Sequence, residues 1–113
     1  MQQHKRYQLV YIREIKEDPV LYLYESVRVK GELIEVATDK AVIEYEGVSL
    51  TLNLEYIDTI DYSIGTMIEC FGDIINDKQS NEIMLQPRII RNLDTLDMEL
   101  HDRVIHVIRS TAL

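Results

Sequence analysis

The chain has 113 residues and a mass of 13.3 kDa, enough for one domain with one hydrophobic core. Twenty acidic and 12 basic residues give a net charge of −8, and 46% of the residues are hydrophobic, as is usual for a globular protein. The excess acid lies beyond residue 30, because residues 1–30 hold six bases and four acids and residues 31–113 hold six bases and 16 acids. Non-specific affinity for DNA comes mainly from basic side chains that displace counterions, so tight DNA binding by the isolated chain is not expected.

The sequence shows no sign of secretion or membrane insertion. No apolar run approaches the roughly 20 residues of a membrane-spanning helix, and the first 18 residues are too polar for a signal peptide. The single cysteine, Cys70, excludes an internal disulfide. We therefore expect a soluble intracellular domain with no membrane contact.

The N-terminal part is expected to lie along the domain as an extension with strand character. Residues 7–13 and 20–24 are rich in residues that favour strands. The first strand proper begins at Val27 and alternates inward valines with outward bases. Gly31 interrupts this alternation, which resumes after it. A glycine within a strand indicates a sharp bend where the strand turns the corner of a small barrel.

Four further strands follow at close spacing. Residues 41–46 and 48–54 alternate and form a hairpin that turns at Glu46-Gly47. Residues 66–75 and 82–91 are joined by a wholly polar loop, and Pro87 in the last strand indicates an edge or a bulge. Between the two pairs, residues 55–62 are expected to form a short turn of helix that plugs one end.

The tail has a helical period from a cap at Asp94 or Thr95. At about 100° per residue, its apolar side chains cover nearly twice the roughly 100° arc that a helix on one core needs. We therefore expect one side on the barrel and the other on a partner, although the sequence leaves open which is which. The barrel side is assigned Leu96, Leu100 and Val107, and the partner side Met98, His101, Ile105 and Ile108, with Val104 on the border.

Together these elements predict an all-β fold with helices, of the five-stranded OB-fold type. A sandwich is a weaker interpretation, because five strands fall short of the usual seven. The expected single domain, 1–113, comprises an N-terminal extension (1–25), a barrel (26–91) and a C-terminal interface helix (94–112).

Three segments carry a resemblance to a known family: the strand 27–33 with its glycine, the strand 67–72, and the apolar helix 96–108 that begins Leu-Asp-Met-Glu-Leu. Their arrangement resembles the small single-OB subunits of two related complexes, the Ten-one subunit of the CST telomere-capping complex and the smallest subunit of replication protein A. The strand-like extension favours the Ten-one family, because the replication subunit has a helical start there.

The resemblance implies a heterodimer with an Stn-type OB-fold protein through C-terminal helices, together with a larger CST subunit. It also implies a nuclear protein at telomeres that supports single-stranded telomeric DNA binding, end protection and telomere length control. The alternatives are the smallest subunit of a replication protein A-like complex, an OB-fold protein-interaction module with no DNA role, and a homodimer built on the same helix.

The candidates for DNA contact are few. Two bases on the outer face of the first strand, two bases near the end of the fifth strand and a tyrosine able to stack on a nucleobase give this set: Arg28, Lys30, Arg88, Arg91 and Tyr45. An alternative stays open for two of them, since the first strand of an OB-fold neighbours the fourth. Arg28 and Lys30 would then pair with Glu69 and Asp73 across the sheet.

No pattern supports catalysis. The sequence lacks a glycine-rich phosphate loop, a Cys-x-x-Cys or His-x-x-x-His pair and a nucleophile elbow. His101 and His106 are five residues apart and lie on different flanks of the expected helix, so a metal site is not expected. We predict a non-enzymatic protein without a cofactor.

Overall fold

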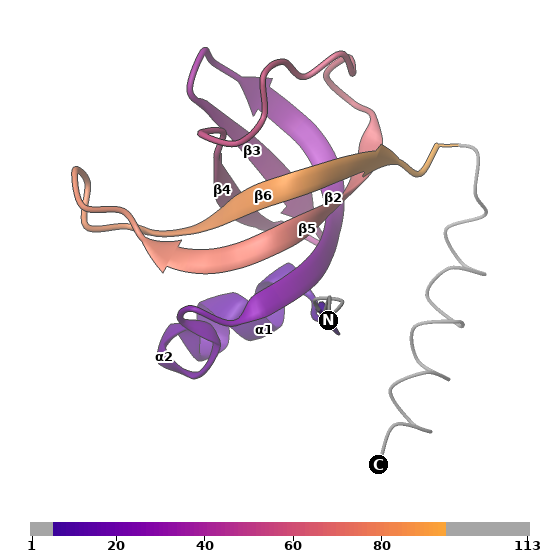
Figure 1. The fold of residues 1–113 in the computed structure, drawn as a ribbon. Helices are drawn as coiled ribbons and strands as arrows, with labels where there is room; N and C mark the ends of the chain where they lie inside the picture. Colours follow the sequence, from indigo (N-terminus) through magenta and orange to yellow (C-terminus); the bar gives the residue numbers. More distant parts are fainter. Residues whose placement is uncertain (1–5, 95–113) are drawn as a thin grey trace, which may run out of the picture.

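Six strands and two short helices make up residues 6–94, the part of the chain that the computed structural model describes (Figure 1). The expected C-terminal helix therefore lies outside the described residues. Within them, no helix is long and apolar enough to span a bilayer. In chain order the elements are β1 (Gln8–Leu9), α1 (Ile12–Glu17), α2 (Pro19–Tyr22), β2 (Ser26–Val36), β3 (Lys40–Tyr45), β4 (Val48–Asn53), β5 (Met67–Asn76) and β6 (Ile83–Asn92).

The sheet closes on itself through β2. Its strand order is β1-β2-β3-β4-β6-β5, and β5 pairs with β2 in addition. The first part of β2, from Ser26 to Glu32, pairs with β5, and the part from Glu32 to Val36 pairs with β3. The contact between β4 and β6 is parallel, whereas β2–β3, β3–β4, β2–β5 and β5–β6 are antiparallel. This closed order of five strands confirms the predicted OB-fold.

Gly31 lies where β2 passes from one neighbour to the other. A Cβ atom at this position would come within 2.9 Å of the Cβ of Ile43 on β3, so only a glycine allows this close approach. The register between β2 and β3 then shifts between Leu33 and Glu35. The predicted bend at Gly31 is thus confirmed, and its cause is the close passage of β2 over β3.

A β-bulge interrupts the pairing of β5 with β6. Gly72 lies opposite Pro87 and Phe71 lies opposite Ile89, which leaves Arg88 as the extra residue. A side chain on Gly72 would come within 2.6 Å of the Cα of Pro87, so a glycine is needed opposite the bulge. The prediction of an edge or bulge at Pro87 is confirmed as a bulge.

Helix α1 completes the hydrophobic core from the N-terminal side. Its Ile12 and Ile15 are buried, and the helix contacts β2, β3 and β4. The core combines these two side chains with the inward residues of the strands, among them Val27, Val29, Leu33, Ile43, Leu50, Leu52, Ile68, Cys70, Ile74 and Leu85.

The expectation of strand character in the N-terminal extension is wrong apart from the two residues of β1. The Glu14 carboxylate accepts a hydrogen bond from the backbone N–H of Tyr11 at the start of α1. The Asp18 carboxylate accepts one from the N–H of Leu21 at the start of α2, where Pro19 stands in the first turn. These local caps favour helix over the strand propensity of the apolar residues between them.

Residues 55–62 form turns and bends and contain no helix, so the predicted helical plug is also wrong. Ile57, Ile60 and Tyr62 are nevertheless partly buried against the core. This segment runs along the top of Figure 1, whereas α1 lies at the bottom. The helix that packs onto the barrel thus comes from the N-terminal extension.

Leu52→Ala should lower the free energy of unfolding by about 2–5 kcal/mol, because Leu52 is fully buried and the change leaves a cavity. Urea unfolding monitored by circular dichroism measures this loss as a lower midpoint at an unchanged slope. Ser49→Ala on the same strand is the control, since its side chain is exposed and the change should stay within about 0.5 kcal/mol. Equal midpoints for the two variants would contradict the assignment of Leu52 to the core.

Candidate nucleic-acid interface

Three of the predicted DNA contacts meet on the outer face of β2, β5 and β6. Arg28 projects from β2, and Arg88 and Arg91 project from β6. In a regular strand, residues three apart point to opposite faces. The bulge at Arg88 adds one residue, so that both β6 arginines are exposed, Arg88 by 46% and Arg91 by 52% of the side chain. We call Arg28, Phe71, Arg88 and Arg91 the arginine surface.

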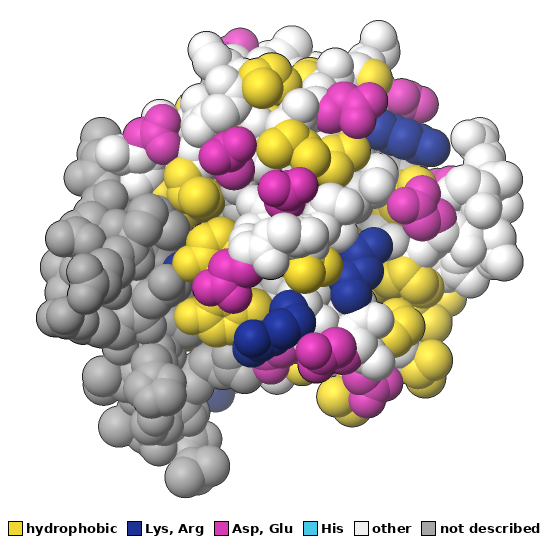
Figure 2. All heavy atoms as spheres, turned by 180° about the vertical axis from the view of Figure 1, so that it is seen from behind, with side chains coloured by type: hydrophobic (Ala, Val, Ile, Leu, Met, Phe, Trp, Pro, Cys, Tyr) yellow, Lys and Arg dark blue, Asp and Glu magenta, His cyan; other side chains and the backbone are white. Residues whose placement is uncertain are grey.

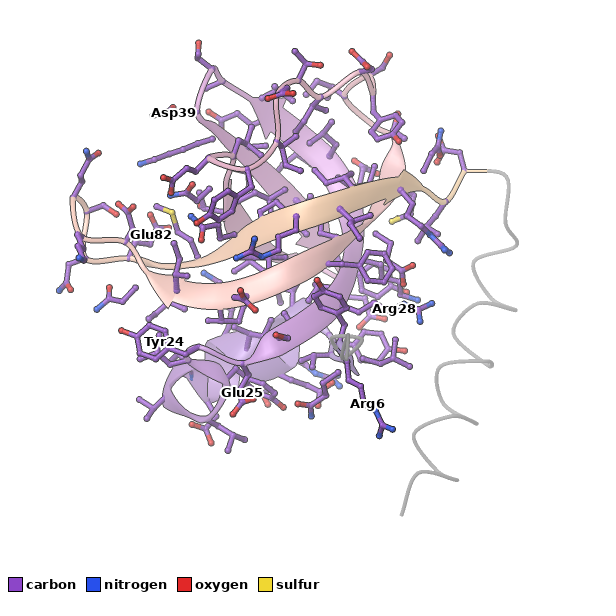
Figure 3. The ribbon with its side chains drawn as sticks, viewed as in Figure 1. Arg6, Tyr24, Glu25, Arg28, Asp39 and Glu82 are labelled. Atoms are coloured by element: carbon purple, nitrogen blue, oxygen red, sulfur yellow. The ribbon has the colours of Figure 1, made fainter. Side chains whose placement is uncertain are left out.

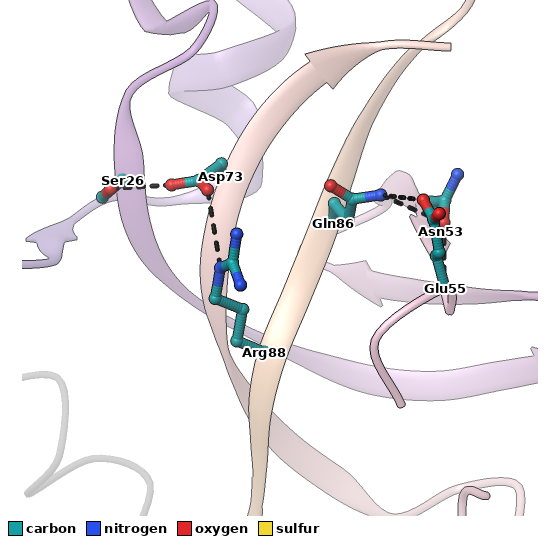
Figure 4. A network of polar contacts seen from close by, with 6 residues as sticks. All are labelled: Ser26, Asn53, Glu55, Asp73, Gln86 and Arg88. Atoms are coloured by element: carbon teal, nitrogen blue, oxygen red, sulfur yellow. Dashed lines mark hydrogen bonds and ion pairs between the residues drawn. The ribbon is translucent and has the colours of Figure 1, made fainter. Parts of the chain in front are cut away.

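Two carboxylates on β5 lie beneath these arginines. Arg28 Nε donates to Glu69 Oε2 over 2.7 Å, and Arg91 Nη2 lies 3.4 Å from Glu69 Oε1. Arg88 Nε lies 3.8 Å from Asp73 Oδ2, and the Ser26 hydroxyl donates to the other oxygen of Asp73 over 2.7 Å (Figure 4). The alternative that paired Arg28 with Glu69 across the sheet is therefore confirmed.

Aromatic rings hold the guanidinium groups from the side. Phe71 lies between Arg28 and Arg91, whose guanidinium carbons are 5.4 and 5.7 Å from the ring centroid. The Tyr7 ring meets Phe71 edge to face at 5.6 Å, and Arg88 lies 4.5 Å from the ring of Tyr56. Such contacts fix the planar guanidinium groups without using up all of their N–H donors.

The arginines are more exposed than the carboxylates beneath them, and this difference decides which ligands the surface can bind. The Glu69 side chain is 1% exposed and that of Asp73 is 21% exposed, both less than any of the three arginines. Three positive charges therefore lie above two negative ones on a protein that is acidic overall. A guanidinium group donates in a fork that matches a phosphate, so this face can bind a polyanion.

Lys30 and Tyr45 do not join the arginine surface. Only 3% of Lys30 is exposed, and its Nζ lies 4.8 Å from the ring centroid of Tyr45 and 5.4 Å from that of Tyr11. The two rings stack on each other with 6.0 Å between centroids. Lys30 is thus enclosed between the N-terminal extension and β3, where a phosphate has no access to it.

Burial lowers the pKa of Lys30 from 10.5 to about 8, although the negative charges of Glu46 and Glu69 act in the opposite direction. Burial and the charge of Glu46 also raise the pKa of Tyr45. The ammonium group therefore pays a desolvation cost that two rings and two carboxylates only partly offset. Lys30 interacts with the protein's own groups at this position.

Sequence reasoning missed the aromatic members of the site. Phe71 is the single phenylalanine, and it alternates with Glu69 and Asp73 on the outer face of a strand. An outward phenylalanine between two acids is unusual, and this pattern is the signal that could have revealed it. Tyr56 was one of seven tyrosines that could stack on a base, but nothing in the sequence distinguished it from the others, because it reaches Arg88 from a loop. The expected partner-binding residues lie outside the described residues, and within residues 6–94 no group of three or more His, Cys, Asp or Glu side chains could hold a metal ion.

The stability that Lys30 contributes should depend on pH. Between pH 8 and 10.5 the folded state has released the Lys30 proton while the unfolded state retains it, so the free energy of unfolding rises with pH in this window. Burial also raises the pKa of the Cys70 thiol, which acts against this rise at alkaline pH. Urea unfolding of the parent should therefore be compared with that of Lys30→Met, in which Cys70 and Tyr45 are unchanged. The parent should gain stability relative to the variant from pH 8 upward, and a constant difference would contradict the buried, neutralised lysine.

Comparisons with known proteins agree with this fold. Residues 3–111 match a family model described as a telomere-capping CST complex subunit. The chain is 34% identical over 86 residues to the CST complex subunit TEN1 of Arabidopsis thaliana, which covers 74% of this chain and 68% of the relative.

Two solved structures from Saccharomyces pombe are similar in shape. The telomere capping protein Ten1 has a TM-score of 0.72 at 10% identity, covering 93% of this chain and 99% of that chain. A chain of the Stn1–Ten1 complex has a TM-score of 0.71 at 13% identity and covers 94% of both chains. At such identities the likeness shows the fold alone, so the family rests on the model match and the plant relative.

Proposed function

The chain belongs to the Ten1 family of telomere-capping CST complex subunits, and from this premise we propose that it is a non-enzymatic subunit that forms a heterodimer with an Stn-type OB-fold protein. A solved complex of Stn1 with Ten1 contains a chain of the same fold. Assembly with a larger CST subunit and a role at nuclear telomeres in end protection and length control belong to the same proposal.

The sequence feature that carries the heterodimer is the width of the apolar arc that residues 96–112 would present as a helix. One small barrel offers one core, so an arc of nearly twice the usual width needs a second surface to cover it. We assign the partner side to Met98, His101, Val104, Ile105 and Ile108. Each apolar side chain buried there contributes about 1.5–3 kcal/mol.

Met98→Glu combined with Ile105→Glu should abolish binding of the Stn-type partner, because the interface would bury two carboxylates without counter-ions. Co-purification measures the binding, and circular dichroism of the variant alone measures its folding. The control is His106→Glu with Ser110→Glu, which adds the same two charges on the polar arc and should leave binding intact.

Two outcomes would contradict this assignment of the helix face, and a third would contradict the identity of the partner. If the Met98/Ile105 variant binds as well as its control, the partner lies on the other side of the helix. If that variant is unfolded, the side belongs to the barrel core. Capture of the middle subunit of replication protein A in place of an Stn-type protein would support the alternative function.

We further propose that the arginine surface contributes phosphate contacts to single-stranded telomeric DNA once the complex has formed. The net charge of −8 opposes DNA binding by the chain alone. In a complex, a partner can supply most of the affinity while three well-held guanidinium groups add local contacts. Their outward position above Glu69 and Asp73 supports this role.

Arg88→Gln with Arg91→Gln should weaken binding of a single-stranded telomeric oligonucleotide by the heterodimer. Each phosphate contact that is lost should lower the slope of log K against log salt by about 0.7, so the pair should lower it by about 1.4. Fluorescence anisotropy at several salt concentrations measures the slope. The control is Arg13→Gln with Lys16→Gln, which removes two exposed bases from α1. Equal slopes for the two double variants would refute the proposed contacts.

A further inference from the structure

A groove of about 730 Å³ lies at the side of the barrel away from Arg28, and Gln86, two residues before Arg88, lines its edge nearest the arginine surface. The β2–β3 loop, the end of β4 and the β5–β6 hairpin form its walls, and Tyr24 lies at its rim. Figure 3 shows Tyr24, Glu82 and Asp39 along this side, with Arg28 on the opposite side. The described chain also ends on the opposite side, at residue 94, so the groove is separate from the place where the expected interface helix begins.

Tyr24 presents its ring to solvent from a strained backbone. The residue is 73% exposed, and its φ of +65° is unusual for a bulky residue. A hydrogen bond from its N–H to the carbonyl oxygen of Ile74, 2.7 Å long, holds the backbone in this position. The exposed ring lies outside the hydrophobic core and is therefore accessible to a ligand.

The apolar surface continues from Tyr24 onto α2. Val20 is 80% exposed and Leu21 is 62% exposed, although both are large hydrophobic residues in the first turn of a short helix. Figure 2 shows hydrophobic side chains gathered over this region, at its lower right, with acidic side chains beside them. An apolar patch beside a polar groove is typical of a protein-binding surface.

The groove itself carries an excess of negative charge. Asp39, Glu55 and Asp77 line it together with Lys40 and Lys78. The pKa of Asp77 is lowered chiefly by hydrogen bonds from Ser80 and to a smaller degree by the positive charge of Lys40, so the charge of Lys40 acts on Asp77. The carboxylates of Asp39 and Glu55 and the ammonium group of Lys78 are thus the charges left for a ligand, and all three residues are exposed.

Glu55 is held in place for such a contact. Gln86 Nε2 donates to Glu55 Oε2 over 3.0 Å and lies 3.5 Å from Asn53 Oδ1 (Figure 4). The backbone N–H of Glu55 donates to the same Asn53 oxygen over 3.0 Å. These amide side chains fix the carboxylate and can also meet the backbone of an extended peptide.

We propose that this groove binds a positively charged segment of a protein partner, with basic side chains on Asp39 and Glu55 and an apolar side chain on Tyr24, Val20 and Leu21. The excess of carboxylates favours a basic segment over a nucleic acid, because three acids and two lysines line the groove. The site does not depend on the proposed function, and a partner can occupy it while the C-terminal segment engages another chain.

Nuclear magnetic resonance of the isotope-labelled full chain tests the proposal with two probes, a Gly/Ser peptide carrying arginines and leucines, and oligothymidylate. The peptide should shift the backbone amides of Tyr24, Asp39, Glu55 and the β5–β6 hairpin. Asp39→Asn with Glu55→Gln should raise the peptide Kd by roughly fivefold, since each exposed ion pair contributes modestly. The control is Glu17→Gln with Asp58→Asn, which removes two exposed acids outside the groove and should leave the Kd unchanged.

Tyr24→Asn tests the apolar contact separately. Asparagine tolerates a positive φ, so this variant removes the ring without new backbone strain. It should raise the peptide Kd by roughly tenfold, as expected for an aromatic anchor. The proposal is overturned if the peptide leaves the groove amides unshifted, if the Asp39/Glu55 variant binds like its control, or if oligothymidylate shifts these amides in place of the peptide.

Discussion

The pairing of β2 with both β5 and β3 is the constraint on which the rest of the structure depends. Because β2 pairs with β5 over its first part and with β3 over its last part, it must bend between them. At the bend, Gly31 passes close to Ile43. Closure then brings the outer face of β2 beside those of β5 and β6. The Arg28–Glu69 pair and the contact of Arg28 with Phe71 exist only because residues some 40 positions apart become neighbours there.

The same small acidic body presents two surfaces of opposite character. Where strands lie side by side, the arginines stand above the carboxylates of β5, and the outward charge is positive. Where loops and a hairpin surround the groove, carboxylates face outward beside exposed apolar residues. The net charge of −8 describes neither surface. The charge that a ligand contacts depends on whether the basic or the acidic side chains lie outermost. The two binding sites that we propose would therefore recognise ligands of opposite charge.

Much of the barrel could be predicted from the sequence, because alternation and the two marker residues Gly31 and Pro87 report local backbone geometry. The N-terminal helices could not be predicted, because they are only six and four residues long. Over such short segments, the strand propensity of the apolar residues is a stronger signal than the capping residues. Their helical form also removes the feature by which the sequence separated the Ten-one family from the replication subunit, so the family rests on the comparisons. Enclosure of Lys30 depends on Tyr11, from a different segment, and no local pattern reports such a contact.

The origin of the helix that fills the barrel has a consequence for the order of folding. The β3–β4 hairpin turns at Glu46-Gly47, and β5 and β6 are joined by a short loop, so both can form from local encounters. The pairing of β2 with β5 and the docking of Ile12 and Ile15 must instead close long stretches of chain, which costs entropy before any burial repays it. During synthesis, the N-terminal extension leaves the ribosome first, yet it has nothing to pack against until the strands that form its site have followed. Its exposed isoleucines are then open to chaperones or to premature association, and this interval lasts until β4, the last of the strands that α1 contacts, has been made.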